Sequence, residues 1–138
     1  MDDYPVVVSA GSLRSSNSAA VQFPHRWTDS GVTVDGAFTG AHLLHLSIAG
    51  CVLNDLYREA VKLDITLHGV RVTAQGGFDQ QWASTGIDYS VEIDSTASAE
   101  QLADLLALVD DVAEIPKAMR RGAVVRRSTR NVIHPPVD

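Results

Sequence analysis

The apolar and polar positions of the chain predict short strands near the N-terminus. Two apolar runs, residues 6–10 and 19–23, end at Gly11 and Pro24, and a polar segment separates them. Runs of this kind bounded by Gly or Pro are typical of strands, so we predict that the two form an antiparallel pair. Residues 32–34 are a candidate for one more short strand, because turn-forming Asp, Ser and Gly residues flank them.

The most apolar stretch of the chain, residues 39–53, predicts a long helix. Thr39 is a suitable N-cap for a helix over residues 41–63. Apolar residues cover nearly the whole circumference of its first half, whereas the second half is amphipathic, so we expect the helix to start buried and to end at the surface. One small sheet cannot cover all sides of an apolar helix. We therefore expect the first half to meet a second copy of the chain in an obligate homodimer.

Two segments with alternating apolar and polar residues predict a long hairpin. They are residues 70–75 and 87–94, and a Gly-rich connection that contains Trp82 joins them. Strands that are adjacent in sequence pair antiparallel, and the predicted helices would cover a face of the sheet. The order of elements thus predicts an α+β fold, with residues 1–138 as a single domain.

A capping box marks the start of a second helix. Ser98 and Gln101 have the required spacing, and residues 102–112 behind them carry apolar side chains at the i, i+3, i+4 positions of a helix packed on one face. Pro116 can open a short third helix, which would stop at Gly122.

The C-terminal end of the chain offers fewer signals. Residues 123–125 are a candidate for a last strand, and residues 131–138, which contain two prolines, are expected to be extended or loose. Basic residues concentrate here: Lys117, Arg120, Arg121, Arg126, Arg127 and Arg130. A solvated face is favoured for them over an anion site.

Composition narrows the class of protein. The chain has 138 residues, of which 45% are hydrophobic, and a net charge of −6. This size suits one globular domain, and the acidic balance disfavours nucleic acid and anionic membranes as partners. The sequence has no run long enough to span a membrane and begins with acidic residues, so we expect a cytoplasmic protein. A single cysteine, Cys51, excludes a disulfide within one chain.

The run Leu-Leu-His-Leu-Ser-Ile-Ala-Gly-Cys at residues 43–51, together with the order of elements, resembles the OsmC/Ohr family of osmotically inducible and organic hydroperoxide resistance proteins. Residues 67–72 stand where that family has a Gly-Val strand, and residues 115–119 follow the second helix. The resemblance implies antiparallel sheets packed around a long buried central helix and a second amphipathic helix. It also implies an intertwined homodimer with its cysteines near the subunit interface.

The same resemblance implies thiol chemistry. In active members a peroxidatic cysteine attacks the peroxide, a second cysteine resolves the sulfenic acid as a disulfide, and a Glu and an Arg polarise the thiolate. Cys51 matches the first cysteine, and Arg14 is the candidate for the arginine. The resolving position falls on Ala113 and the glutamate position on Ala41. The resemblance therefore implies a one-cysteine hydroperoxide reductase that depends on an external thiol reductant.

Helical spacing predicts which residues surround the cysteine. Asp55 lies one turn after Cys51, and Arg58 lies two turns after it on the same side. A nearby carboxylate raises the pKa of a thiol, whereas a nearby guanidinium lowers it. Four residues are predicted to line a pocket for a small hydrophobic peroxide or ligand: Leu44, Ser47, Ile48 and Asp55.

The two histidines of the helix, His42 and His45, point well away from Cys51 at about 100° per residue. Core or interface roles are favoured for them over a ligand or acid/base role contributed across the dimer. They lack further ligands at metal-binding spacing, and we expect no metal and no cofactor.

Three functions stay open at this level. The first is hydroperoxide reduction by Cys51. The second is a non-catalytic dimer that binds a small hydrophobic ligand. The third is a purely structural dimer in which Cys51 is a packing residue, since a free cysteine is among the most often buried residue types.

Overall fold

A computed structural model of the chain describes residues 3–134 and 136. The elements follow in the order β1 (Val6–Gly11), β2 (Val21–Phe23), β3 (Val32–Asp35), α1 (Gly40–Lys62), β4 (Gly69–Phe78), β5 (Ser84–Asp94), α2 (Ala99–Val112) and α3 (Glu114–Arg121). The strands form one antiparallel sheet in the order β2-β3-β1-β4-β5. The predicted α+β fold is thus confirmed.

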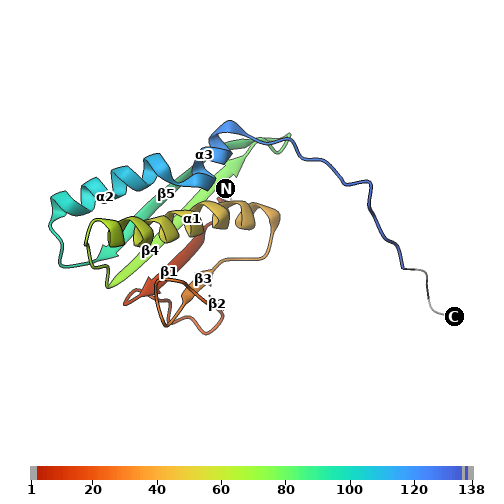
Figure 1. Ribbon diagram of the computed structural model, residues 1–138. Helices are drawn as coiled ribbons and strands as arrows, with labels where there is room; N and C mark the ends of the chain where they lie inside the picture. The colour runs from red at the N-terminus through yellow and green to blue at the C-terminus, as the bar shows by residue number, and fades with distance from the viewer. Residues whose placement is uncertain (1–2, 135, 137–138) are drawn as a thin grey trace.

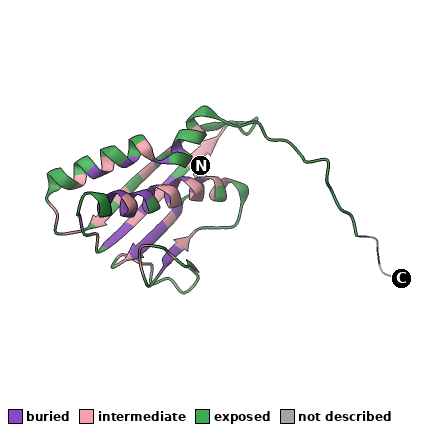
Figure 2. Cartoon of the chain, viewed as in Figure 1, coloured by how far each residue is buried: buried purple, intermediate pink, exposed green. Residues whose placement is uncertain are grey.

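The helices lie together on one side of the sheet (Figure 1). α1 packs across β1 and β4, and both α2 and α3 contact α1. The core lies between these layers, where Val8 and Val72 of the sheet meet Val52 and Leu56 of α1, and all four side chains are buried. Figure 2 shows this core as the buried stripe that runs along the central strands and the inner side of α1.

The pairing of the N-terminal strands differs from the prediction. β1 pairs with β3 on one side and with β4 on the other, so that Val8 lies opposite Val34 and Val72. β2 pairs with β3 and not with β1. The reason is burial. Most of β1 is buried, which suits a central strand, whereas all three residues of β2 are exposed, which suits a short edge strand.

Helix α1 begins as predicted, since the Thr39 hydroxyl caps it by accepting a hydrogen bond of 3.2 Å from the backbone N–H of His42. The burial expected for its first half involves a second copy of the chain and stays a prediction. The first turns are half-exposed, with Leu43 39% exposed, whereas Tyr57 and Ala60 near the other end are buried. α2 lies alongside this later half and covers it (Figure 1).

The hairpin and the second helix match their predictions. β4 and β5 pair over their whole length, with Val72 opposite Val91. The capping box of α2 is complete. The Ser98 hydroxyl accepts from the backbone N–H of Gln101 at 3.1 Å, and the Gln101 side chain accepts from that of Ser98 at 3.0 Å. Local side-chain chemistry therefore defines the start of α2.

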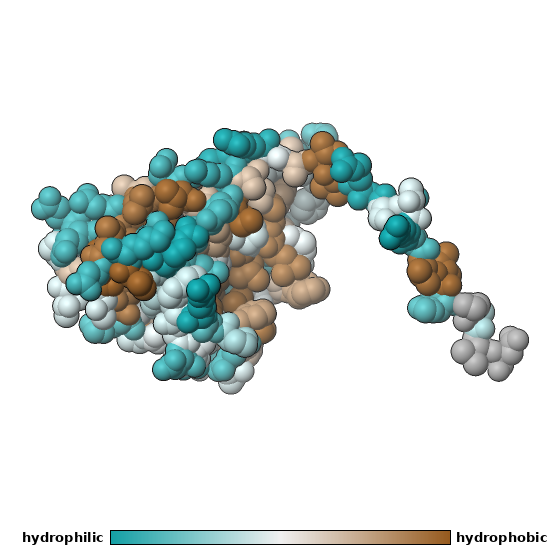
Figure 3. Space-filling model, viewed as in Figure 1, coloured by the Kyte–Doolittle hydropathy of each residue, from teal (hydrophilic) through white to brown (hydrophobic). Residues whose placement is uncertain are grey.

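The third helix begins slightly earlier than predicted, at Glu114, and ends before Gly122, whose φ of 75° is left-handed. The predicted strand over residues 123–125 is wrong. In the part of the chain that is described, this segment is extended, with Val124 79% and Val125 93% exposed, and it leads away from the body (Figure 3). A segment forms a strand only beside a partner that accepts its hydrogen bonds.

Residues 131–134 of the predicted tail form no helix or strand, as expected for an extended or loose segment, and residues 135, 137 and 138 of that prediction lie outside the described residues. Among the helices that are described, none combines the length and apolar character needed to cross a membrane.

Candidate functional site

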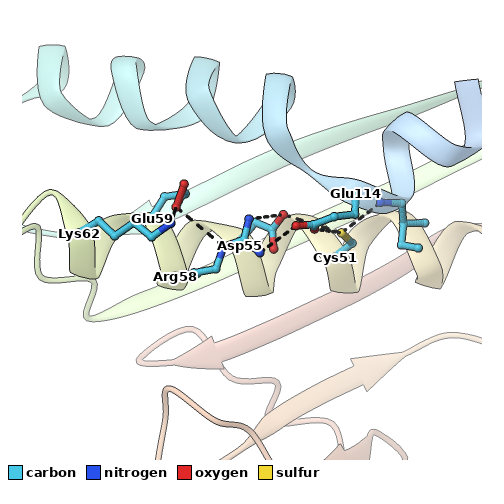
Figure 4. Close-up of polar contacts among 7 residues, drawn as sticks. Cys51, Asp55, Arg58, Glu59, Lys62 and Glu114 are labelled. Carbon is cyan, nitrogen blue, oxygen red and sulfur yellow. Dashed lines mark hydrogen bonds and ion pairs between the residues drawn. The ribbon is translucent and has the colours of Figure 1, made fainter.

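The cysteine lies in the middle of α1, on the side that faces the start of α3 (Figure 4). Its Sγ lies 3.9 Å from Oδ2 of Asp55, one turn further along α1. It also lies 3.7 Å from Oε2 of Glu114 and accepts a hydrogen bond from the backbone N–H of Ile115 at 3.5 Å. The thiol is therefore bordered by two carboxyl groups and one amide donor.

The connection between α2 and α3 brings Glu114 to this position. Ala113 is fully buried, and its extended backbone ends α2 and begins α3. This is the residue that the family resemblance assigns to the resolving position. The structure thus places the next residue, Glu114, beside Cys51. Sequence reasoning missed this glutamate, although an acidic residue directly after Ala113 was the available signal.

Arg58 completes the arrangement, two turns after Cys51. Its Nη1 lies 2.9 Å from Oε1 of Glu114, and its Nη2 lies 3.2 Å from Oδ2 of Asp55 (Figure 4). The guanidinium therefore binds both carboxyl groups that touch the thiol. We call Cys51, Asp55, Arg58 and Glu114 the thiol cluster.

Burial and the neighbouring charges shift the pKa values of the residues in the thiol cluster. Burial raises the pKa of the Cys51 thiol, and the charges of Asp55 and Glu114 raise it further, against the lowering effect of the Ile115 N–H. Burial and the contact with Glu114 raise the pKa of Asp55 to about 6, although Arg58 opposes this. The pKa of Glu114 is lowered to about 2, most strongly by a hydrogen bond from its own backbone N–H and next by the hydrogen bond from Arg58. Cys51 is accordingly a protonated thiol at neutral pH in the isolated chain.

Three of these residues could also hold a metal ion. The ligand atoms of Cys51, Asp55 and Glu114 all lie within 4.8 Å of one another. However, the guanidinium of Arg58 already contacts both carboxylates, so an ion would have to displace it. The arrangement is complete as an ion-pair cluster around a thiol.

The other predicted catalytic residue, Arg14, lies in the loop after β1. Its Nε is buried without a hydrogen-bond partner, and no polar contact with Cys51 is found among residues 3–134. Its catalytic role stays a prediction. Ala41, the predicted glutamate position, lies in the first turn of α1, about 15 Å along the helix axis from Cys51. Arg58 is the arginine that binds the two carboxyl groups beside the thiol.

The predicted pocket residues line separate cavities. Ile48 borders a cavity of about 300 Å³ with a largely apolar lining that includes Ile87, Tyr89, Pro116 and Met119. Ser47 borders a neighbouring one of about 290 Å³, whose lining includes Ile115 and Met119. The shared Met119 places both cavities against α3, close to the thiol cluster.

The remaining two pocket residues lie elsewhere. Leu44 borders a cavity of about 590 Å³ at the start of α1, together with Tyr4, Phe78 and Trp82. Asp55 lines none of these three cavities, because its side chain is buried within the thiol cluster. The four residues therefore do not enclose one common pocket within the single chain.

The two histidines have structural surroundings. His45 is fully buried, its Nδ1 lies 2.8 Å from the Tyr4 carbonyl oxygen, and its ring stacks on Phe78. His42 lies 2.6 Å from the Thr39 hydroxyl through its Nδ1. Neither hydrogen-bonds to Cys51 in the part of the chain that is described.

Known proteins share this sequence pattern and fold. The family model described as "OsmC-like protein" matches residues 33–127. The chain is similar to an OsmC-like protein from Mycoplasma pneumoniae, with a TM-score of 0.56 and 13% identity over 77% of this chain and 89% of that one. It is also similar to an OsmC-like hydroperoxide resistance protein from Jannaschia sp. CCS1, with a TM-score of 0.51 and 14% identity over 93% and 95%. The search of curated proteins finds no match. Since the family model spans more than half of the sequence, the chain belongs to the OsmC-like family.

Proposed function

We propose that this protein reduces hydrophobic hydroperoxides with Cys51 as its one redox-active cysteine. The observation that carries the proposal is the half-buried position of Cys51 in helix α1 of the OsmC-like fold, with its thiol beside Asp55 and Glu114 and both carboxyl groups bound by Arg58. One similar structure is that of a hydroperoxide resistance protein, which supports this class of reaction.

The reaction begins at the Cys51 sulfur. The sulfur attacks one oxygen of the peroxide, the O–O bond breaks, and a sulfenic acid and an alcohol form. The thiol proton passes to a carboxylate of the thiol cluster, where Asp55 is the stronger base because its pKa lies near 6. The leaving alkoxide takes up this proton from the carboxyl group to become the alcohol, so that the carboxylate is restored. Two molecules of an external thiol then return the sulfenic acid to the thiol, because the chain has no second cysteine.

The surroundings of the thiol favour an apolar substrate. Of the two cavities against α3, one is lined by Ile48, Pro116 and Met119 among others. The other is lined by Met119 and by Ile115, whose N–H contacts the Cys51 sulfur. An alkyl or aryl hydroperoxide would bury its apolar part there. Hydrogen peroxide has no such part to bury, so it is the poorer substrate.

A homodimer belongs to the same proposal. The start of α1 exposes apolar surface, including Leu43, and the extended segment after α3 exposes Val124 and Val125. Exposed apolar surface of this kind is typical of subunit contacts. Sedimentation of the full chain at micromolar concentration is expected to give twice the mass of one subunit, and a monomer would contradict this part of the proposal.

The test of the reaction is consumption of cumene hydroperoxide with dithiothreitol as reductant. Wild type is expected to consume it faster than hydrogen peroxide and to yield a dimedone adduct on Cys51. Cys51→Ser is the matched control and is expected to be inactive. If wild type consumes the peroxide no faster than free cysteine does and forms no adduct, the proposal is contradicted.

The second candidate function is binding of a small hydrophobic ligand without catalysis. The raised pKa of the Cys51 thiol favours it, because a protonated thiol is a weak nucleophile. Lauric acid serves as the probe. An equal rise of Tm in wild type and Cys51→Ser, without peroxide consumption, would select this function over the first.

A further inference from the structure

The backbone N–H of Ile115 has an unusual acceptor. Ile115 lies in the first turn of α3, where N–H groups have no acceptor within their own helix. Its N–H instead donates to the Cys51 sulfur at 3.5 Å, between segments 64 residues apart in sequence. The next residue is Pro116, which has no N–H. Ile115 is therefore the backbone amide that α3 directs at the thiol.

We propose that oxidised Cys51 forms a covalent S–N bond with the backbone nitrogen of Ile115. This inference rests on the proposed function, which supplies the sulfenic acid. The S–O bond of the sulfenic acid breaks and the S–N bond forms, while the amide hydrogen and the hydroxyl leave as water. The sulfur keeps the oxidation level that the peroxide gave it, and no further oxidant is needed.

The geometry favours this fate over the alternatives. A sulfenic acid condenses either with a thiol or with a backbone nitrogen, and otherwise it is oxidised further to a sulfinic acid. The chain contains no other thiol. The position assigned to a resolving cysteine is Ala113, only two residues before the amide that contacts the sulfur. The Ile115 nitrogen would thus protect Cys51 in place of the resolving thiol.

The charged neighbours fit the same step. The Glu114 carboxylate lies 3.7 Å and the Asp55 carboxyl 3.9 Å from the sulfur, and Arg58 holds both in position. These carboxyl groups can carry the amide proton to the departing hydroxyl. An external thiol reverses the bond. It attacks the sulfur, the nitrogen recovers its hydrogen, and a second thiol releases Cys51 from the mixed disulfide.

Intact-mass spectrometry tests the proposal directly. After one equivalent of cumene hydroperoxide without reductant, we expect a chain that is lighter by two hydrogen atoms and that returns to its original mass with dithiothreitol. A disulfide cannot explain this change within one chain, because Cys51 is the single cysteine. A disulfide between two chains would double the mass on a non-reducing gel. Peptide mapping is expected to link the peptides that contain Cys51 and Ile115.

Two variants sharpen the test. Ile115→Pro removes the amide hydrogen, whereas Ile115→Val keeps it. We expect the lighter species in Ile115→Val and not in Ile115→Pro, together with a severalfold larger sulfinic acid fraction in Ile115→Pro under excess peroxide. If Ile115→Pro does not fold, as judged by circular dichroism, the linked peptides of wild type decide the question.

Labelling of the sulfenic acid with dimedone distinguishes failure of the S–N bond from failure of the proposed peroxide reduction. A dimedone adduct on Cys51 without any lighter chain overturns the S–N bond and leaves peroxide reduction intact. The absence of both the adduct and the lighter chain overturns both proposals. A lighter chain whose linked peptides do not include Ile115 also overturns the assignment.

Discussion

The guanidinium of Arg58 and the carboxylate of Glu114 form an ion pair of 2.9 Å that joins the later half of α1 to the first residue of α3. The two residues lie 56 positions apart in sequence, and the cysteine is in contact with the glutamate of this pair. The pair therefore couples the packing of α3 to the surroundings of the thiol.

Replacing this arginine should release both carboxyl groups. In Arg58→Gln we expect the pKa of Asp55 to rise above about 6 and that of Glu114 to rise above about 2, because Arg58 lowers both. NMR titration of the carboxyl carbons measures these shifts. The free energy of unfolding should fall by about 1 kcal/mol, since the pair is partly exposed. Arg71→Gln is the control, because Arg71 pairs with Glu92 instead. Unchanged carboxyl pKa values in Arg58→Gln would contradict the ion-pair assignment.

The stability of the protein should fall as the pH rises through the titration of Asp55. Its pKa is about 6 in the folded chain against 3.8 in the unfolded chain, so the folded state binds more protons between these values. This carboxyl group thus stabilises the fold below about pH 4 and loses that contribution by about pH 6. Glu114, with a pKa lowered from 4.5 to about 2, acts in the opposite direction at lower pH.

Above about pH 5.5 the Glu114 carboxyl is ionised in both the folded and the unfolded chain, so the difference in urea midpoint between wild type and Asp55→Asn from there to neutrality reports the Asp55 contribution. Asp55→Asn is expected to have a flatter profile than wild type. Asp88→Asn, at an exposed position on β5, should keep the wild-type slope. A profile of Asp55→Asn as steep as that of wild type would show that another group causes the decline.

Replacing large side chains of α1 with alanine should lower the free energy of unfolding only on the buried side of the helix. Leu56 is 0% exposed and Val61 is 68% exposed on the same helix. Leu56→Ala is expected to lower the free energy of unfolding by about 2–5 kcal/mol, because it leaves a cavity in the core. Val61→Ala should change it by less than about 0.5 kcal/mol. Urea denaturation measures both, and equal losses would indicate that Val61 is covered in solution by a second subunit.

Replacing two glycines with alanine should change the stability of the protein in opposite directions. A Cβ at Gly50, inside α1, would meet nothing within 4 Å, so Gly50→Ala should stabilise by about 0.5–1 kcal/mol through helix propensity. Gly11 has a φ of +62°, and a Cβ there would lie 2.2 Å from the His68 carbonyl oxygen. Gly11→Ala should destabilise, because the backbone must shift. Thermal unfolding of both variants tests this pair, and a lower Tm for Gly50→Ala would contradict the expectation.

Local side-chain chemistry made several elements predictable from the sequence. The Thr39 cap and the capping box of Ser98 and Gln101 define the helix starts through contacts within a single turn. Alternation over β4 and β5 specified a hairpin because side chains of a strand point to opposite faces. The run that ends at Cys51 indicated the family. Each of these signals depends on neighbours in sequence.

The tertiary structure decided what depends on distant partners. β3 lies between β1 and β2 because the buried β1 must occupy the centre of the sheet, and no local pattern specifies that order. Glu114 reaches Cys51 because α2 ends at the right point to turn the chain back onto α1. The sequence by itself determined the fold class, the family and a candidate thiol. Helical spacing already placed Asp55 and Arg58 on the side of Cys51, and only the packing of α3 against α1, over 63 and 64 residues of separation, brought Glu114 and the Ile115 amide to that thiol.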